Sequence, residues 1–238
     1  MAGDAWADVR SFAAEQGPVS GPKWVAHVVL GEAACDLGDA YAATARSWWD
    51  KTRQDGDERS FDEVFAVLPR ARRHITLTWI ERAAAEVTAD QIEQLQETIA
   101  RRAAIFEPFL LQVGPAIVNT YAIELYLPPH RMLNALQVAV AGAYRAAFGP
   151  ETRPEPRHKF WRGHTSIGYC RHEFRDEGLA SALLRTPGPV AHYLGPAIAP
   201  IDHVLLVPED AFAPGGLTWD LDQARRIPLG RPATDVPR

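Results

Sequence analysis

The sequence predicts an α+β protein of two similar lobes, in which two antiparallel sheets face each other across a central groove and the helices lie outside. Three observations support this prediction. Expected strands and helices alternate along the chain, with Gly-Pro and Pro-Gly pairs at several boundaries. Two of the expected strands share a His-x-(Thr/Ser) pattern. Each of these two strands is followed by an expected helix, so the second lobe is expected to repeat the arrangement of the first.

The N-terminal half is expected to alternate between short strands and longer helices. The segment 61–68 fits two interpretations: a helix opened by the Ser60-x-x-Glu63 capping box, or a strand that includes the apolar run 64–68. A second capping box, Thr88 with Gln91, opens a longer helix. The expected elements are a helix at 4–16, a strand at 23–30, a helix at 36–51, a strand at 72–79, a helix at 88–104 and a strand at 109–113.

The C-terminal half continues the same alternation. Leucine, valine and tyrosine recur at helical spacing after Pro129, and the helix that they predict ends at Gly149-Pro150. The expected elements are a strand at 121–127, a helix over 133–148, a strand from His164, a helix at 176–184 and closing strands at 201–207 and 217–227. Residues 21–230 are expected to form a single bilobal domain, preceded by an extension at 1–20 and followed by a loose tail at 231–238.

Two expected strands present the same polar groups in the same order. They are Arg72-Arg73-His74-Ile75-Thr76-Leu77-Thr78-Trp79 and Arg162-Gly163-His164-Thr165-Ser166-Ile167-Gly168-Tyr169. Strand side chains alternate between faces, so each strand carries a guanidinium, an imidazole and a hydroxyl on one face and mostly apolar side chains, Tyr169 among them, on the other. If the fold brings the two polar faces together, they form a symmetric cleft with two titratable imidazoles. Such a cleft suits a phosphodiester and requires no metal.

Composition and charge narrow the class of partner. The net charge of −5 argues against duplex DNA, whose binding relies on an extended basic surface. Basic residues nevertheless gather ahead of both motifs, which favours a small anionic substrate. The two cysteines, Cys35 and Cys170, have neither a CxxC nor a zinc-ligand spacing and indicate a reduced, cytoplasmic setting. No apolar run approaches the roughly 20 residues of a membrane-spanning helix, so no membrane partner is expected.

With His74-Ile-Thr76 and His164-Thr-Ser166 about ninety residues apart, the chain resembles the two-histidine (2H) phosphoesterase superfamily, in its bacterial 2′-5′ RNA ligase-like, cyclic phosphodiesterase branch. The early strand 24–30, the strand at 109–114 and the ending 217–230 extend the resemblance over most of the chain. It implies a bilobal fold with pseudo-twofold symmetry, one motif from each lobe, and no metal or nucleotide cofactor. Gly163 stands where relatives commonly carry proline, and Thr165 where an aliphatic residue is usual; neither change touches the inward-facing pair.

The resemblance also implies an activity and roles for the motif residues. Family members act on 2′,3′-cyclic phosphates of RNA ends or nucleotides, or on 2′-5′ phosphodiester bonds, so a small nucleotide or RNA end is the expected partner. Histidine, whose unperturbed pKa is ~6.5, serves as acid or base at neutral pH. We assign the base role in hydrolysis to His164 and the acid role to His74, although the sequence does not decide between the two orders. Thr76 and Ser166 are expected to donate hydrogen bonds to the non-bridging oxygens.

Further residues have weaker claims on the site. Arg72 or Arg162 is a candidate for a charge-assisted contact to phosphate, against the alternative of a solvated arginine. Trp219 is a candidate for stacking on a base, against the alternative of a core residue. His27 fits the lining of the groove or a core position. Cys170 and His172 share strand spacing but lack a third ligand, so no metal site is expected.

Two other functions fit the same residues. The first is a non-catalytic module that binds a nucleotide or an RNA end. The second is a 2H enzyme that acts on another phosphodiester, such as a 2′-5′ oligoadenylate.

Overall fold

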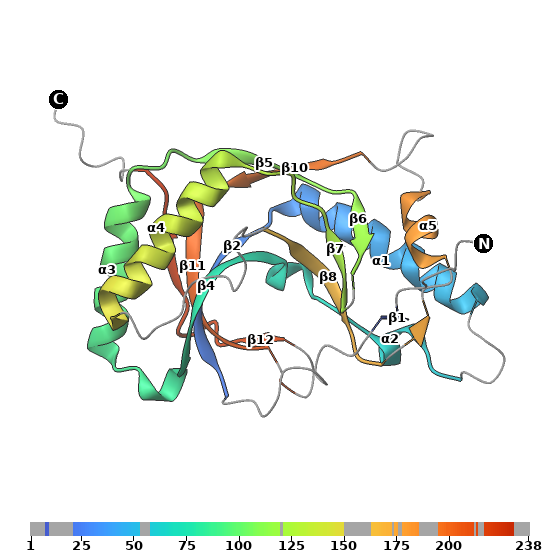
Figure 1. Ribbon diagram of the computed structural model, residues 1–238, viewed down its shortest axis with the longest axis horizontal. Helices are drawn as coiled ribbons and strands as arrows, with labels where there is room; N and C mark the ends of the chain where they lie inside the picture. The colour runs from blue at the N-terminus through green and yellow to red at the C-terminus, as the bar shows by residue number, and fades with distance from the viewer. Residues whose placement is uncertain are drawn as a thin grey trace, which may run out of the picture.

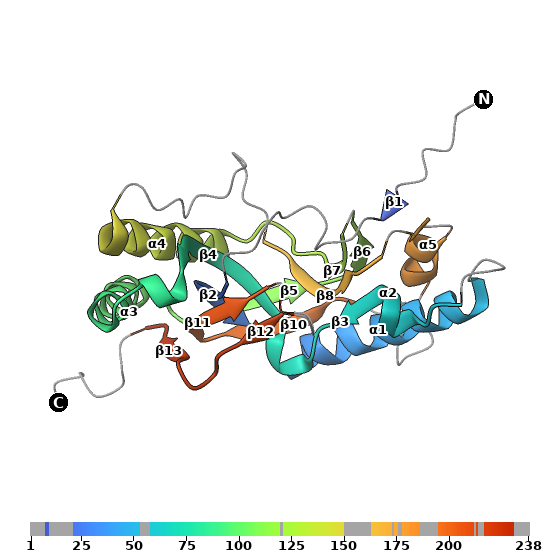
Figure 2. The same ribbon diagram turned by 90° about the horizontal axis from the view of Figure 1, so that it is seen from below.

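The computed structural model describes residues 8–9, 21–52, 58–119, 121–149, 163–172, 174–175, 178–185, 195–211, 213 and 217–230. Over these residues the chain is an α+β protein in which every strand pair is antiparallel, as the sequence predicts. Figures 1 and 2 show an elongated molecule with two larger sheets along its middle and helices toward the outside.

The first lobe contains a five-stranded sheet covered by two long helices. The helices, α3 (Ala89–Ala103) and α4 (Arg131–Phe148), pack on each other, and α4 packs on the sheet through β4. One face of the sheet joins the main core under these helices, and the opposite face carries His27 and His74 beside a smaller apolar cluster that includes Trp219. The strand order is β12-β11-β2-β4, and β13 also pairs with β11. The strands are β2 (Lys23–Val29), β4 (His74–Ala83), β11 (His203–Asp210), β12 (Thr218–Trp219) and β13 (Arg225–Pro228).

The second lobe contains a four-stranded sheet in the order β3-β8-β7-β6. Helix α1 (Glu32–Thr52) packs on β8, and α5 (Leu179–Leu184) packs on α1 and β6. The strands are β3 (Phe65–Val67), β6 (Ala116–Val118), β7 (Ala122–Leu125) and β8 (Thr165–Cys170). The remaining elements are the pair β5 (Phe109–Val113) and β10 (Ala197–Ile201), the pair β1 (Asp8–Val9) and β9 (Phe174–Arg175), helix α2 (Phe61–Val64) and the 3-10 turns η1 (Arg70–Arg72) and η2 (Ala84–Glu86).

The chain crosses between the lobes several times. It passes from β2 in the first lobe to α1 and β3 in the second, and returns to the first at β4. Each strand with a His-x-(Thr/Ser) motif is followed by a helix of its own lobe, α3 after β4 and α5 after β8. Strand β4 lies at an edge of its sheet and contacts β8 of the other sheet, as both views show (Figures 1 and 2). The crossings therefore bring the two motif strands to the junction of the sheets.

Several expected elements differ in detail from the structure. Both the helix and the strand expected within 61–68 are present. Helix α2 begins at the Ser60–Glu63 capping box, and β3 follows it directly. The single strand expected at 217–227 is two strands, β12 and β13, which both pair antiparallel with β11 and are separated by a turn at 221–222. Of the helix expected at 4–16 the structure describes only Asp8–Val9, which is a strand, since these residues pair with β9. The rest of that segment lies outside the described residues.

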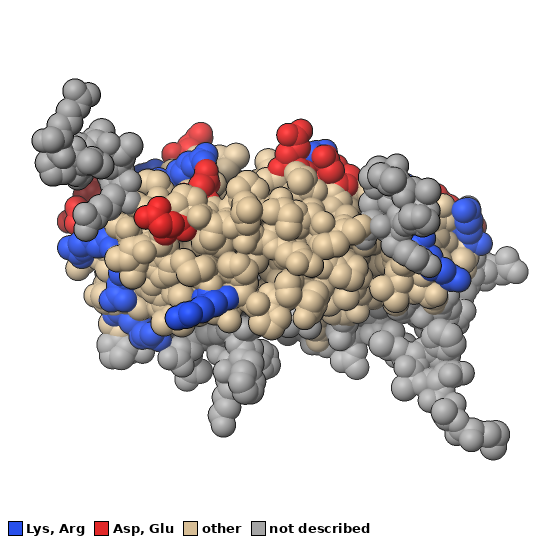
Figure 3. Space-filling view, turned by 90° about the horizontal axis from the view of Figure 1, so that it is seen from above, with Lys and Arg blue, Asp and Glu red and all other residues tan. Residues whose placement is uncertain are grey.

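The face seen in Figure 3 is broadly uncharged at its centre, and its basic and acidic side chains lie around the margins. Strands β5 and β10 run along this side of the molecule in Figure 1, and their exposed side chains include Leu110 and Ile198. No extended basic surface is visible on this face. None of the helices in the described part of the chain has the length and apolar character required to cross a membrane.

Gly168 allows β8 to approach β3 closely, since a Cβ at this position would lie 2.9 Å from the carbonyl oxygen of Ala66 and 3.2 Å from Cα of Val67. Both neighbours are backbone atoms, so they cannot rotate away. We expect Gly168→Ala to lower the free energy of unfolding by about 1–3 kcal/mol, measured by denaturant titration. Gly195→Ala is the matched control, because its Cβ would meet no described atom within 4 Å. Equal stability of the two variants would contradict the close approach.

Candidate active site

His74 is the first residue of β4, and its ring is fixed by the turn that precedes the strand. Nδ1 lies 2.6 Å from the backbone oxygen of Arg72. A carbonyl oxygen can only accept a hydrogen bond, so Nδ1 carries the proton and Nε2 of the neutral ring carries a lone pair. The backbone oxygen of Arg73 accepts a bond from the amide of Leu30, and the buried Arg73 guanidinium contacts Asp39 and the backbone oxygen of Cys35. The start of β4 is therefore anchored to α1 as well as to β2.

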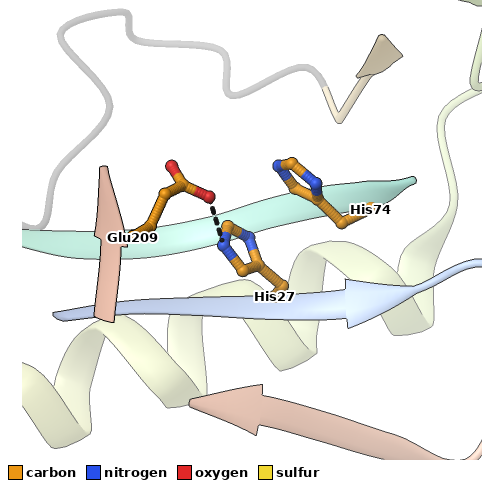
Figure 4. A group of neighbouring side chains, drawn as sticks. All are labelled: His27, His74 and Glu209. Carbon is orange, nitrogen blue, oxygen red and sulfur yellow. Dashed lines mark hydrogen bonds and ion pairs between the residues drawn. The ribbon is translucent and has the colours of Figure 1, made fainter. Parts of the chain in front are cut away.

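Neighbouring strands surround His74 with polar groups on the same face of the first sheet. His27 of β2 lies directly opposite Thr76, and its ring centroid is 4.1 Å from that of His74. Nε2 of His27 lies 2.9 Å from Oε2 of Glu209 on β11, the contact dashed in Figure 4. The indole nitrogen of Trp219 on β12 donates to the same carboxylate oxygen at 2.8 Å. Four strands therefore contribute to one buried polar cluster.

Burial and neighbouring charges together set the protonation of His74 and Glu209. Loss of water around His74, followed by the like charge of His27, lowers the His74 pKa from 6.5 to about 3. Burial by itself would raise the pKa of the Glu209 carboxyl. The positive charge of His27 and hydrogen bonds from His27 and Trp219 outweigh burial and lower the Glu209 pKa to about 2. At neutral pH His74 is therefore a neutral imidazole beside an ionised carboxylate.

The second motif forms a matching half-site on β8. His164 directly precedes the strand and its side chain is 51% exposed, in contrast to the buried His74. Ser166 lies opposite Glu124 of β7 in the strand register. Oε1 of Glu124 is 3.9 Å from Nε2 of His164, so a carboxylate lies beside the imidazole in this half-site. In each lobe, the hydroxyl residue of the motif is paired across strands with a titratable group.

The structure brings the two half-sites together where β4 meets β8. His164 is near enough that its charge contributes to lowering the pKa of His74. The motif strands are far apart in sequence and belong to different sheets, yet their histidines share one electrostatic environment. This juxtaposition is the one that the repeated motif predicts.

Tyr169 departs from the face expected for it. The register between β7 and β8 shifts between Ile123 and Glu124, so β8 contains a bulge and the alternation of its side chains is interrupted. Ile167 still belongs to the main core, whereas Tyr169 packs against the smaller apolar cluster that contains Trp219. Burial, and then the nearby carboxylates of Glu209 and Glu124, raise the pKa of Tyr169 above its usual range. The tyrosine therefore lies between the two half-sites as a neutral phenol.

The other residues predicted to bind substrate are Arg72, Arg162 and Trp219, and the structure places them differently. Arg72 is not part of the motif strand: it ends the η1 turn that delays the strand until His74, and its guanidinium donates to the backbone oxygen of Leu217 at 2.7 Å. Arg162 lies outside the described residues. Trp219 lies at the site, 7% exposed, with its ring stacked on His27 at 5.1 Å. These contacts give Trp219 a role in holding the histidines, and its ring has little free surface for a base.

Sequence reasoning missed Glu209 and Glu124 and left His27 undecided. The only available signal was a charged residue within an apolar strand, as in Tyr121-Ala-Ile-Glu124-Leu-Tyr-Leu127. A buried carboxylate is rare unless it is paired, so this signal indicates a partner without saying which.

No protein-family model and no curated protein matches the sequence. Solved structures do match. TT0787 of Thermus thermophilus aligns with a TM-score of 0.57 and 15% identity, over 86% of this chain and 97% of that chain. LigT of E. coli in its apo form aligns with a TM-score of 0.53 and 15% identity, over 89% of this chain and 100% of that chain. The chain has the LigT fold. A structure described as a phosphoesterase shares this LigT-like fold, with a TM-score of 0.50 and 15% identity over 88% of this chain and 99% of that chain.

Proposed function

We propose that the protein is a metal-independent phosphoesterase that hydrolyses 2′,3′-cyclic phosphates of nucleotides or RNA ends by two-histidine acid/base catalysis, and that the same site reversibly joins 2′-5′ linkages when an RNA 5′-hydroxyl replaces water as the nucleophile. The main support for the proposal is that His74 and His164 lie at one site. His74 is buried and neutral, and His164 is exposed beside the carboxylate of Glu124. Acid/base hydrolysis requires two groups in opposite protonation states at one site. The LigT-like fold and the nearby hydroxyls of Thr76 and Ser166 add support.

The proton on Nδ1 of His74 leads us to reverse the order of roles assigned from the sequence. Nε2 of His74 holds a lone pair and takes a proton from the attacking water as its oxygen bonds to phosphorus. The bond from phosphorus to one ribose oxygen breaks, and His164 gives its proton to that oxygen. In the reverse reaction the two histidines exchange roles. Charge that builds on the non-bridging oxygens is stabilised by Thr76 and Ser166, and each donor of this kind contributes about 10²–10³-fold in rate.

A small nucleotide or an RNA end is the substrate class that the site favours. The half-exposed His164 gives the substrate an approach to the second half-site, and the acidic net charge of −5 disfavours a long polyanion. LigT structures have been described as complexes with ATP and with 3′-AMP, which extends the case for nucleotides to a protein of this fold. Contacts from Arg72 or Arg162 to phosphate remain part of the proposal as predictions.

A turnover assay with EDTA present tests the proposal directly. Nucleoside 2′,3′-cyclic monophosphates and RNA with a cyclic phosphate end are incubated with the protein, and the expected result is hydrolysis to a monophosphate at a rate that EDTA does not reduce. Binding of the same ligands without turnover would establish the non-catalytic module instead. Turnover of a 2′-5′ oligoadenylate but of neither cyclic phosphate would assign the enzyme to another phosphodiester.

A further inference from the structure

His27, His74 and Glu209 converge on one point from three adjacent strands. One ring nitrogen of each histidine and one carboxylate oxygen of Glu209 lie within 4.8 Å of one another. Figure 4 shows the two rings and the carboxylate turned toward the same space, from β2, β4 and β11. Two imidazoles and one carboxylate form a donor set that binds zinc, with ligand bonds of about 2.0–2.2 Å. A small inward movement of the side chains would bring all three donors to that range.

The hydrogen bonds around the cluster leave lone pairs available to a cation. Nδ1 of His74 donates to the backbone oxygen of Arg72, which fixes the ring and leaves Nε2 for a ligand. A metal-bound histidine almost always has such an outer partner on its second nitrogen. Trp219 donates to Glu209 and provides the corresponding outer partner for the carboxylate. The outer contacts of two of the three ligands, His74 and Glu209, are therefore already in place.

His27 supplies a second, independent observation. The residue is completely buried, and its Nδ1 has no hydrogen-bond partner among the described residues. Its Nε2 faces Oε2 of Glu209. The contact from Nε2 to Glu209 is therefore the one hydrogen bond of this buried ring among the described residues, and an unpartnered polar atom inside a protein costs about 1–3 kcal/mol. The Glu209 side chain keeps 10% exposure and gives the cluster an edge toward solvent.

The structure assigns a divalent transition-metal site to His27, His74 and Glu209. The cation replaces the proton that His27 shares with Glu209, and that proton leaves to solvent. Zn²⁺ is the cation that this donor set favours, and Co²⁺ serves as its spectroscopic substitute. The consequence for activity rests on the proposed function: a cation held by Nε2 of His74 removes the general base, so it inhibits hydrolysis.

Cobalt titration measures the site without reference to activity. Co²⁺ is added to the full-length, tag-free protein, and the visible absorption of low-symmetry Co²⁺ is followed to saturation. We expect one equivalent to bind, and Glu209→Gln and His27→Gln each to weaken binding by at least about 100-fold. His164→Ala keeps the band, because His164 is not a ligand. His203→Gln also keeps it, although it removes an exposed pair, His203 with Asp202.

Three results would overturn the assignment. They are the absence of a band in the unaltered protein, a band that survives both ligand substitutions, and a band lost in His203→Gln. Should the ligand variants fail to fold, the NMR resonances of the histidine rings in the unaltered protein decide: Zn²⁺ must shift those of His27 and His74, and unshifted resonances refute the site.

The effect of the cation on activity is a separate test. Stoichiometric Zn²⁺ is expected to stop turnover reversibly, with EDTA restoring it, whereas binding without inhibition would leave the cation site standing and remove His74 from the reaction.

Discussion

His74→Ala and His164→Ala are each expected to reduce kcat/KM for a 2′,3′-cyclic phosphate by about 10²–10⁴-fold, because each removes one of the two proton transfers. The rate constant kcat falls with kcat/KM, since the lost interactions belong to the transition state. The double variant is expected to lose little more than the worse single variant, because acid and base act as a unit. Steady-state kinetics in EDTA measure all three variants.

The matched control for this experiment is His203→Ala. His203 lies on β11 of the same sheet but at the opposite end of that strand from Glu209, and its ring contacts Asp202. Its removal is expected to leave kcat/KM within a factor of two. Because the alanine at position 74 also opens a buried space, His74→Asn is made in parallel: its amide retains a donor toward the backbone oxygen of Arg72 and lacks a basic nitrogen. Full turnover by a folded His74→Asn protein would refute the base assignment.

The sequence was sufficient to predict the two half-sites because each motif is local. Period-two alternation places His74 with Thr76 and His164 with Ser166 whatever the rest of the chain does. The strand–helix order also predicted the lobes. It did not predict that the chain crosses between the lobes. Helix α1, for example, follows a strand of the first lobe but packs on the second. Pairing of distant strands is decided by tertiary packing, which local pattern does not report.

The residues that set the properties of the site depend on register. Glu209 meets His27 only because β11 pairs with β2 so that Leu205 lies opposite His27 and Glu209 lies farther along the same face. A change of one residue in that pairing would turn the carboxylate to the other side of the sheet. Tyr169 illustrates the same limit, since the bulge that brings it to the site leaves no mark in the sequence. The charge and burial of the site residues therefore depend on the register in which the strands pair.

Acidification is expected to destabilise the protein through His74. The folded-state pKa of about 3 lies below the unfolded value of 6.5, so the unfolded chain binds the proton first as the pH falls. The stability contributed by the neutral ring is complete above pH 6.5 and is lost progressively toward pH 3. Between pH 7 and pH 5 this one group is expected to remove about 2 kcal/mol from the free energy of unfolding.

Comparison with His74→Asn isolates that contribution. Asparagine does not titrate, so the difference between the two stability curves reports the loss of the imidazole at position 74 together with its charge interactions with His27 and His164. Denaturant titrations at pH 7, 6 and 5 with EDTA are expected to show a curve flatter by about 2 kcal/mol in the variant. Glu209 does not disturb the comparison, because its pKa falls from 4.5 to about 2 and its contribution is lost only below this window. Parallel curves would mean that His74 has the same pKa in the folded and the unfolded protein, which would contradict the effect of burial on this ring.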